Sequence, residues 1–320
     1  MDLLEVKNIS KTYGSGETAV KALKNVSFSV PKGEYVAIVG ESGSGKTTTA
    51  QAIIGLLADN ARRDAGKIVL NGEEISRWSA KRLDTLRGAR ISLVPQDPGN
   101  SLNPVKTIGA QVGEIIQLHQ KVTHAQRDEQ VLALLKKVGL SHPEQRMKQY
   151  PHQLSGGMKQ RVLIAIAIAL SPDVIIADEP TSALDISVQA QILNLLVTLQ
   201  QQRNLTYVLI SHNVSVVRHM SDRVAVMYLG QIVELGSAAQ VLGEPRHPYT
   251  RLLLDSVPRT GEPLDETLAL RKTELPGNRR LPEGCFFRDR CPMAAQGCER
   301  PQPLQPSREG RDVRCWRSLG

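Results

Sequence analysis

The fold of this chain is decided by one eight-residue stretch, Gly40-Glu41-Ser42-Gly43-Ser44-Gly45-Lys46-Thr47. It matches the phosphate-binding pattern G-x-x-x-x-G-K-[ST] in full. The β-branched run 34–39 before it predicts a buried parallel strand, and a helix is expected over 47–57 after it. Glycines let backbone N–H groups wrap phosphate oxygens, and a helix N-terminus adds its positive dipole end. We expect Lys46 to bind the β- and γ-phosphates and Thr47 to offer its hydroxyl to Mg²⁺.

Strand and helix patterns alternate around this stretch. Strands are predicted over 3–9, 22–30, 66–70, 73–75, 174–177, 207–210, 224–228 and 231–234, and helices over 124–137, 156–170 and 187–203. Asn71-Gly72 predicts a type I′ turn, and Leu229-Gly230 a second hairpin turn. Thr123 with Gln126 predicts a capping box, and Gly139 a helix C-cap. The order predicts an α/β fold of the P-loop NTPase (RecA-like) type, with a parallel-sheet core, an antiparallel β subdomain and a helical insertion over about 97–165.

Composition excludes several classes of protein. The 320 residues are 41% hydrophobic and 22% charged, which is ordinary for a soluble globular chain and excludes disorder throughout. Three Phe, six Tyr and two Trp are too few for an aromatic platform that binds single-stranded nucleic acid. The uncharged runs 162–172 and 186–202 are too short or too polar to span a membrane, and the acidic start is unlike a secretory signal. The net charge of +8 is scattered, so we interpret it as a solvated surface and expect a cytoplasmic protein that binds no nucleic acid.

Two further motifs carry chemistry. The predicted strand 174–177 ends at Asp178 and Glu179. Beside the phosphate-binding loop, Asp178 would hold Mg²⁺ and Glu179 would act as general base for the attacking water. The stretch Leu154-Ser155-Gly156-Gly157-Met158 opens a helix and predicts a second anion cradle. A phosphate-binding loop followed by such a second cradle is typical of ABC ATPases.

With these motifs in order, residues 3–250 resemble the ATP-binding subunit of an ABC transporter. The resemblance implies that Tyr13 stacks on adenine, that Gln96 contacts the γ-phosphate and Mg²⁺, and that His212 is the switch histidine. It places Asp185, in Ser182-Ala183-Leu184-Asp185, in the loop that crosses the dimer interface. The nucleotide-binding residues so predicted are Tyr13, Gly40, Glu41, Ser42, Gly43, Ser44, Gly45, Lys46, Thr47, Thr48, Ser155, Gly156, Gly157, Asp178 and Asp185. The predicted catalytic residues are Glu179, His212 and Gln96, and Thr47, Gln96 and Asp178 are the predicted Mg²⁺ ligands.

Other segments narrow the resemblance to dipeptide, oligopeptide and nickel importers. These segments are 97–98 with 101–104, His247-Pro248-Tyr249-Thr250, Leu275-Pro276-Gly277 and 284–292. From Asp173 onward the chain looks especially like the ATPase subunits of D-alanyl-D-alanine dipeptide permeases. The resemblance implies a head-to-tail dimer of ATPase subunits, with a paralogue favoured as the second subunit. It also implies two membrane permease subunits as partners and an extracytoplasmic solute-binding protein as an indirect partner. The chain is then expected to lie peripherally on the cytoplasmic face of the inner membrane. Import of nickel, glutathione or another small solute is the alternative, and a soluble ABC ATPase acting on nucleic acid is a more distant one.

The C-terminal segment forms a separate region in this interpretation. We expect an ATPase domain over 1–254 and an extension over 255–320, because eight of the 18 prolines lie between Pro258 and Pro306. All four cysteines fall in the extension: Cys285, Cys291, Cys298 and Cys315. The absence of C-x₂-C spacing weighs against zinc. A [4Fe-4S] cluster, as some relatives in the dipeptide family carry, and four reduced thiols packed beside Phe286, Phe287 and Trp316 both stay open.

Overall fold

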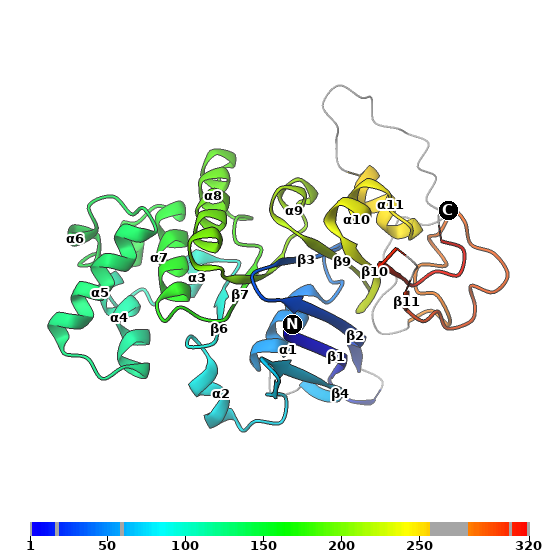
Figure 1. The fold of residues 1–320 in the computed structure, drawn as a ribbon, viewed down its shortest axis with the longest axis horizontal. Coiled ribbons are helices and arrows are strands. Elements are labelled where there is room, and N and C mark those ends of the chain that lie inside the picture. Colours follow the sequence, from blue (N-terminus) through cyan, green and yellow to red (C-terminus); the bar gives the residue numbers. More distant parts are fainter. Residues whose placement is uncertain (1, 17–18, 58–60, 257–280, 307–308, 319–320) are drawn as a thin grey trace. The chain divides into compact units, whose positions relative to one another are not determined.

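The computed structural model describes residues 2–16, 19–57, 61–256, 281–306 and 309–318, without the side chains of 61–64. The chain divides into two compact units, which are described separately. The first unit comprises Pro31–Gly33 and Arg77–Leu209, and the second comprises Asp2–Val30, Glu34–Ser76 and the residues from Ile210 onward. Figure 1 labels their helices and strands. The expected Leu275-Pro276-Gly277 segment lies outside the described residues.

In the first unit, three strands lie in the order β8-β7-β6. They are β6 (Ile91–Val94), β7 (Val174–Asp178) and β8 (Thr206–Ile210). β6 pairs with β7 in parallel, with Val94 opposite Ala177. Every residue of β7 and β8 is buried, as a parallel strand covered on both faces requires. The parallel pairing brings the carboxyl ends of β6 and β7, and the residues that follow them, to one edge.

Helices make up the rest of the first unit. They are α2 (Ala80–Leu86), α3 (Pro98–Ser101), α4 (Ile108–His119), α5 (His124–Lys137), α6 (Pro143–Arg146), the 3₁₀ turn Pro151–Gln153, α7 (Gly156–Ile168) and α8 (Ile186–Arg203). α4, α5 and α7 pack on one another, and the group from α4 to α7 is visible in Figure 1. The predicted capping box of α5 is confirmed, and Gly139 adopts φ +71° just beyond its end. α7 ends two residues before the expected position, because Ser171 precedes a proline and is left-handed at φ +53°.

The second unit contains an antiparallel sheet in the order β2-β1-β4-β5. Its strands are β1 (Asp2–Tyr13), β2 (Val20–Pro31), β4 (Ala61–Leu70) and β5 (Glu73–Glu74). Asn71 and Gly72 have φ of +50° and +81°, as a type I′ turn requires, so this predicted turn is confirmed.

The second unit also contains strands in the order β11-β12-β10-β9-β3. They are β3 (Tyr35–Val39), β9 (Arg223–Tyr228), β10 (Gln231–Ser237), β11 (Gln305–Pro306) and β12 (Asp312–Val313). β3 and β9 are parallel, and β9 and β10 form the expected hairpin. The helices of this unit are α1 (Lys46–Ile54), α9 (Val214–Met220), α10 (Ala238–Gly243) and α11 (Pro248–Asp255).

The predicted fold class is confirmed, and the structure corrects some of its details. α1 ends at Ile54 rather than at 57, because Gly55 adopts the left-handed conformation at φ +72° and closes the helix. The sequence patterns did not predict β6, α2, α9, α10 or α11. The C-terminal segment adds two short strands, and β12 pairs antiparallel with β10. The domain boundary at 254/255 and the limits of the helical insertion stay predictions. None of the described helices is long and apolar enough to cross a membrane.

Candidate nucleotide-binding site

The phosphate-binding loop joins β3 to α1, and its glycines are required by space and conformation. Gly40, Gly43 and Gly45 have φ of +153°, +77° and +101°, which side chains rarely allow. A Cβ on Gly40 would lie 2.2 Å from the carbonyl oxygen of Met227, and one on Gly45 would lie 2.9 Å from that of Ala22. Any other residue at these two positions would have to displace backbone. The loop is therefore fixed in shape by its sequence.

The polar groups of this loop fit a phosphate chain. The Lys46 ammonium is buried and donates to the carbonyl oxygens of Gly40 and Glu41 at 2.9 and 3.0 Å. Gly45 stands at the N-cap of α1 and gives the helix no side-chain cap, so the N–H groups of the first turn, which includes Thr47 and Thr48, point to the loop. The Ser44 hydroxyl is buried and has no hydrogen-bond partner among the described residues. Buried polar groups are normally satisfied, and an anion would satisfy these.

The first unit brings together two of the predicted catalytic residues. Gln96 follows β6 and donates from Nε2 to Oε2 of Glu179, which follows β7, at 2.8 Å. Asp178 is the last residue of β7 and is 6% exposed. Glu179 has a left-handed backbone at φ +44°, an uncommon conformation for a residue with a long side chain. This arrangement places a carboxylate and an amide at one edge of the parallel strands.

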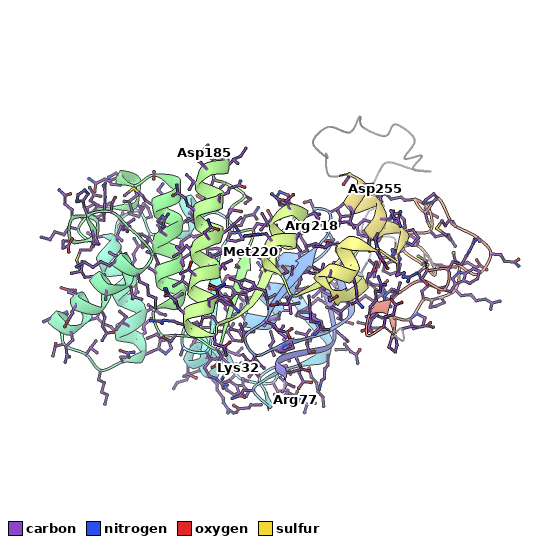
Figure 2. All side chains as sticks on the ribbon, turned by 45° about the horizontal axis from the view of Figure 1, so that its top comes forward. Lys32, Arg77, Asp185, Arg218, Met220 and Asp255 are labelled. Atoms are coloured by element: carbon purple, nitrogen blue, oxygen red, sulfur yellow. The ribbon has the colours of Figure 1, made fainter. Side chains whose placement is uncertain are left out.

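The predicted second anion cradle opens α7. Ser155 caps this helix by accepting the Met158 N–H at 3.4 Å, and Gly156 and Gly157 form its first two positions. A Cβ on Gly157 would lie 2.5 Å from Cγ1 of Val188 on α8, so α7 and α8 approach closely at this point. Asp185 precedes α8, lies exposed and makes no side-chain cap of that helix. Figure 2 shows Asp185 at the free end of α8.

Two predicted nucleotide contacts lie in the second unit with the phosphate-binding loop. Tyr13 is the last residue of β1 and is half-buried. His212 is exposed. The residue before it, Ser211, donates its backbone N–H to the Ile38 carbonyl of β3 at 3.2 Å. His212 therefore lies beside the strand that leads into the loop.

The four cysteines are free, and their thiols interact electrostatically. Cys291 and Cys298 are buried, and Cys285 and Cys315 are half-buried. Burial raises the pKa of Cys285 to about 11, and the other three thiols raise it further. Among the described residues, which include all four cysteines, no group of three or more Cys, His, Asp or Glu residues is arranged to hold a metal ion. The cluster prediction is thus not supported by the geometry and stays a prediction.

A cavity of about 890 Å³ lies in the second unit, between β2 and the C-terminal segment. Lys21, Lys24 and Arg314 line it together with Cys285 and Phe286. Burial lowers the pKa of Lys24, and the charges of Lys21 and Arg314 lower it further. None of the predicted nucleotide-binding residues lines this cavity, so it is separate from the phosphate-binding loop.

Sequence reasoning missed two residues that contact this loop. The Tyr249 hydroxyl accepts the backbone N–H of Glu41 at 2.9 Å, and Arg290 forms a two-pronged ion pair with the Glu41 carboxylate. Tyr249 lies in segment 247–250 and Arg290 in segment 284–292, which resemble segments of dipeptide, oligopeptide and nickel importers. The resemblance marked these segments, but the local sequence pattern did not predict that either residue contacts the loop.

Comparisons with known proteins show the family to which the chain belongs. The ABC transporter family matches residues 23–182, and the oligopeptide/dipeptide transporter C-terminal region matches residues 233–298. The chain is 52% identical to the "Probable D,D-dipeptide transport ATP-binding protein DdpF" of Escherichia coli, over 94% of this chain and 91% of that protein. It is 43% identical to the dipeptide transport ATP-binding protein DppD of the same organism, over 98% and 96%. A solved dimer of the ATP-binding cassette MJ0796, in a post-hydrolysis state bound to ADP and Pi, superposes with a TM-score of 0.66 at 31% identity, over 73% of this chain and 98% of that one.

Proposed function

Because this chain belongs to the ABC transporter family of ATP-binding proteins and carries the C-terminal region of its oligopeptide and dipeptide transporters, we propose that it hydrolyses ATP to energise the import of dipeptides or related small peptides. The observation that carries the ATPase activity is the phosphate-binding loop, in which Lys46 and the buried, unsatisfied Ser44 hydroxyl are already in place. The proposed peptide cargo is supported by the match to the C-terminal region and by the relatives named as dipeptide transport proteins.

In this proposal the loop binds the triphosphate and its metal ion. Backbone N–H groups of the loop and of the first turn of α1 bind phosphate oxygens, and Lys46 exchanges its two carbonyl acceptors for phosphate oxygens. Thr47, Asp178 and Gln96 are the residues that would hold Mg²⁺. When bound, Mg²⁺ neutralises charge on the phosphates. Tyr13 stacks on the adenine ring.

Glu179 and its partners carry out the reaction. The carboxylate takes a proton from the water that attacks the γ-phosphorus, the bond to the β-phosphate oxygen breaks, and ADP leaves with its electron pair. The hydrogen bond from Gln96 holds one carboxylate oxygen of Glu179 and so fixes the orientation of the carboxylate. His212 holds the γ-phosphate and the attacking water. Glu179 is thus the general base, and Gln96 orients it.

We propose that the enzyme works as a head-to-tail dimer. Ser155 and Gly156 of the cradle and Asp185 are exposed and available to a second subunit, for which a paralogue is the favoured candidate. The dimeric structure of the MJ0796 cassette supports dimer formation for proteins of this fold. Two membrane permease subunits complete the transporter, and an extracytoplasmic solute-binding protein delivers the cargo to them. The chain would then lie peripherally on the cytoplasmic face of the inner membrane.

We also propose that the four cysteines hold a [4Fe-4S] cluster. A buried thiol with a pKa raised to about 11 stays protonated alone, and a bound iron centre would supply the positive charge that stabilises four thiolates. What supports this proposal is that all four cysteines fall in one segment, Cys285 to Cys315, as in some relatives in the dipeptide family that carry such a cluster. Iron content and visible absorbance of anaerobically purified protein test this. Colourless, iron-free protein would leave four reduced thiols.

Reconstitution tests the proposed function. The chain is co-expressed with candidate permease and ATPase subunits, and the complex is placed in liposomes with a panel of loaded binding proteins. We expect a dipeptide-loaded binding protein to stimulate ATP hydrolysis, and a Lys46→Ala variant of the complex to be inactive. Stimulation by nickel or glutathione alone would assign the alternative cargo. No ATP hydrolysis under any condition would contradict the proposal.

A further inference from the structure

Glu41 is the first residue of the phosphate-binding loop with a side chain, and each of its polar groups is engaged. Its backbone N–H donates to the Tyr249 hydroxyl at 2.9 Å. Its carbonyl oxygen accepts from the Lys46 ammonium at 3.0 Å. Its two carboxylate oxygens accept from Nη1 and Nη2 of Arg290 at 2.8 and 3.0 Å. One residue therefore connects the C-terminal segment to the lysine that we assign to ATP.

Arg290 is held rigidly for this contact. It is 3% exposed, and its guanidinium lies 5.7 and 5.8 Å from the ring centres of Tyr228 and Phe287. The rings of Tyr228 and Tyr249 lie 4.6 Å apart, and Phe287 lies 5.4 Å from each. Aromatic residues are only 3% of the chain, yet three of them gather at this point. The packed rings leave Arg290 little freedom to turn away from Glu41.

The backbone behind these side chains is also fixed. His247, at the N-cap of α11, accepts the Tyr249 N–H at 3.0 Å. The buried Glu234 of β10 accepts the backbone N–H groups of Arg246 and His247, each at 2.9 Å. Arg311, next to β12, lies 3.6 Å from the same carboxylate. α11 and the C-terminal segment are thus tied to β10, so Tyr249 has a rigid support.

The ion pair differs from an ordinary surface pair, which contributes little because both side chains are mobile and screened by water. The Arg290 side chain is 4% exposed, the Glu41 side chain is 30% exposed, and the contact is bidentate. Bidentate pairs fix orientation as well as distance. Removing one partner would leave a buried charge without compensation, so the pair constrains the loop strongly.

We infer that Tyr249 and Arg290 are positioning residues for ATP binding, and that they act through Glu41 on the loop and on Lys46. The inference rests on the proposed ATPase function and deepens it, because it makes the C-terminal segment a working part of the nucleotide site. A loop held in its binding shape loses less conformational freedom when ATP arrives, and affinity rises accordingly. Without the clamp formed by Tyr249 and Arg290, part of the free energy of ATP binding would be used to order the loop, and the affinity for ATP would fall.

Calorimetric titration of the purified full-length chain with Mg-ATP tests this inference. Arg290→Met removes the charge and keeps much of the volume, and we expect its Kd to rise about tenfold. Arg290→Lys keeps the charge but cannot form the bidentate contact, so its affinity for Mg-ATP should lie between those of Arg290→Met and the unmodified protein. Arg288→Met is the matched control, because Arg288 lies two residues away, pairs with Asp289 and does not contact the loop. Its Kd should equal that of the unmodified protein.

Two further variants make the outcome decisive. Tyr249→Phe removes one hydroxyl from a ring that stays packed, so the protein should fold and its Kd should rise about threefold. In the double variant Glu41→Gln/Arg290→Met, the loss should be no larger than in Arg290→Met alone if the two residues act through one contact. A purely structural role would lower the melting temperature of the nucleotide-free protein and leave Kd at low temperature unchanged.

An unchanged Kd in both Tyr249→Phe and Arg290→Met overturns the inference. If Arg290→Met does not fold, Tyr249→Phe alone decides. Different results would contradict the proposed ATPase function. The unmodified protein would not bind Mg-ATP, or a Lys46→Ala variant would bind it equally well.

Discussion

Gln96 donates a hydrogen bond to the Glu179 carboxylate at 2.8 Å, although 83 residues separate them in the sequence. The contact arises from topology. Val94 and Ala177 face each other in the parallel pair β6 and β7, so the residues that follow both strands emerge at the same edge. The left-handed backbone of Glu179 directs its side chain there. The pair supplies a carboxylate in a set orientation, which is what proton abstraction from water requires.

Replacing Glu179 should separate ATP binding from ATP hydrolysis. Glu179→Gln keeps the shape but has no carboxylate to take a proton, so we expect kcat of the assembled transporter to fall by about 10²- to 10⁴-fold while Mg-ATP still binds. Turnover by phosphate release and binding by calorimetry measure the two effects. Glu129→Gln, on the exposed face of α5, is the control and should be fully active. Normal turnover in Glu179→Gln would remove it from the role of general base.

Two adjacent glycines of α7 should respond differently to alanine. The added Cβ of Gly157→Ala would lie 2.5 Å from Val188 Cγ1, and we expect the overpacking to lower the free energy of unfolding by about 1–3 kcal/mol. The Cβ of Gly156→Ala would lie 3.4 Å from Leu184, an ordinary contact, so this control should be neutral or slightly stabilising. Urea denaturation measures both. Adding Val188→Ala to Gly157→Ala should restore part of the loss, and equal effects at the two glycines would contradict the close approach of α7 to α8.

Local sequence rules predicted much of the site, because its motifs stand where strands end and helices begin. The loop at Gly40–Thr47, the acidic pair at the end of β7 and the turn at Asn71-Gly72 each follow from residue types within a few positions. β6 escaped prediction because Ile91-Ser92-Leu93-Val94 is short and does not alternate strictly. The predicted helix 47–57 extends beyond α1, because residue types alone do not show that Gly55 is left-handed and ends the helix.

The clamp on Glu41 could not be predicted in this way. Glu41 and Tyr249 are 208 positions apart, and Glu41 and Arg290 are 249 apart. Propensity and periodicity describe neighbours along the chain, whereas these contacts depend on how β9, α11 and the C-terminal segment pack in three dimensions. The resemblance drew attention to the segments that contain Tyr249 and Arg290, but it did not predict that both residues contact Glu41.

The C-terminal strand should depend on the buried pair of Arg311 and Glu234. Both side chains are at most 1% exposed. Arg311→Met removes the cation beside the Glu234 carboxylate, together with the hydrogen bonds of Arg311 to Glu309 and to the Glu244 carbonyl oxygen, and we expect the free energy of unfolding to fall by about 3 kcal/mol. Urea denaturation followed by tryptophan fluorescence measures this loss. Arg300→Met, on an exposed residue of the same segment, is the control, and a similar small effect in both variants would contradict a stabilising pair.

His247 should make stability fall in mild acid. Burial lowers the pKa of this imidazole from 6.5 to about 3, and the Arg314 charge lowers it further, so the folded protein keeps it neutral. The unfolded chain takes up the proton below pH 6.5, so this stability is fully present above that pH and is lost as the pH falls toward 3. Between pH 7 and pH 5 the loss should reach about 2 kcal/mol. In His247→Asn the amide can still accept the Tyr249 N–H, and urea denaturation across this range should show a correspondingly flatter profile. An identical pH dependence in the two proteins would mean that another group is responsible.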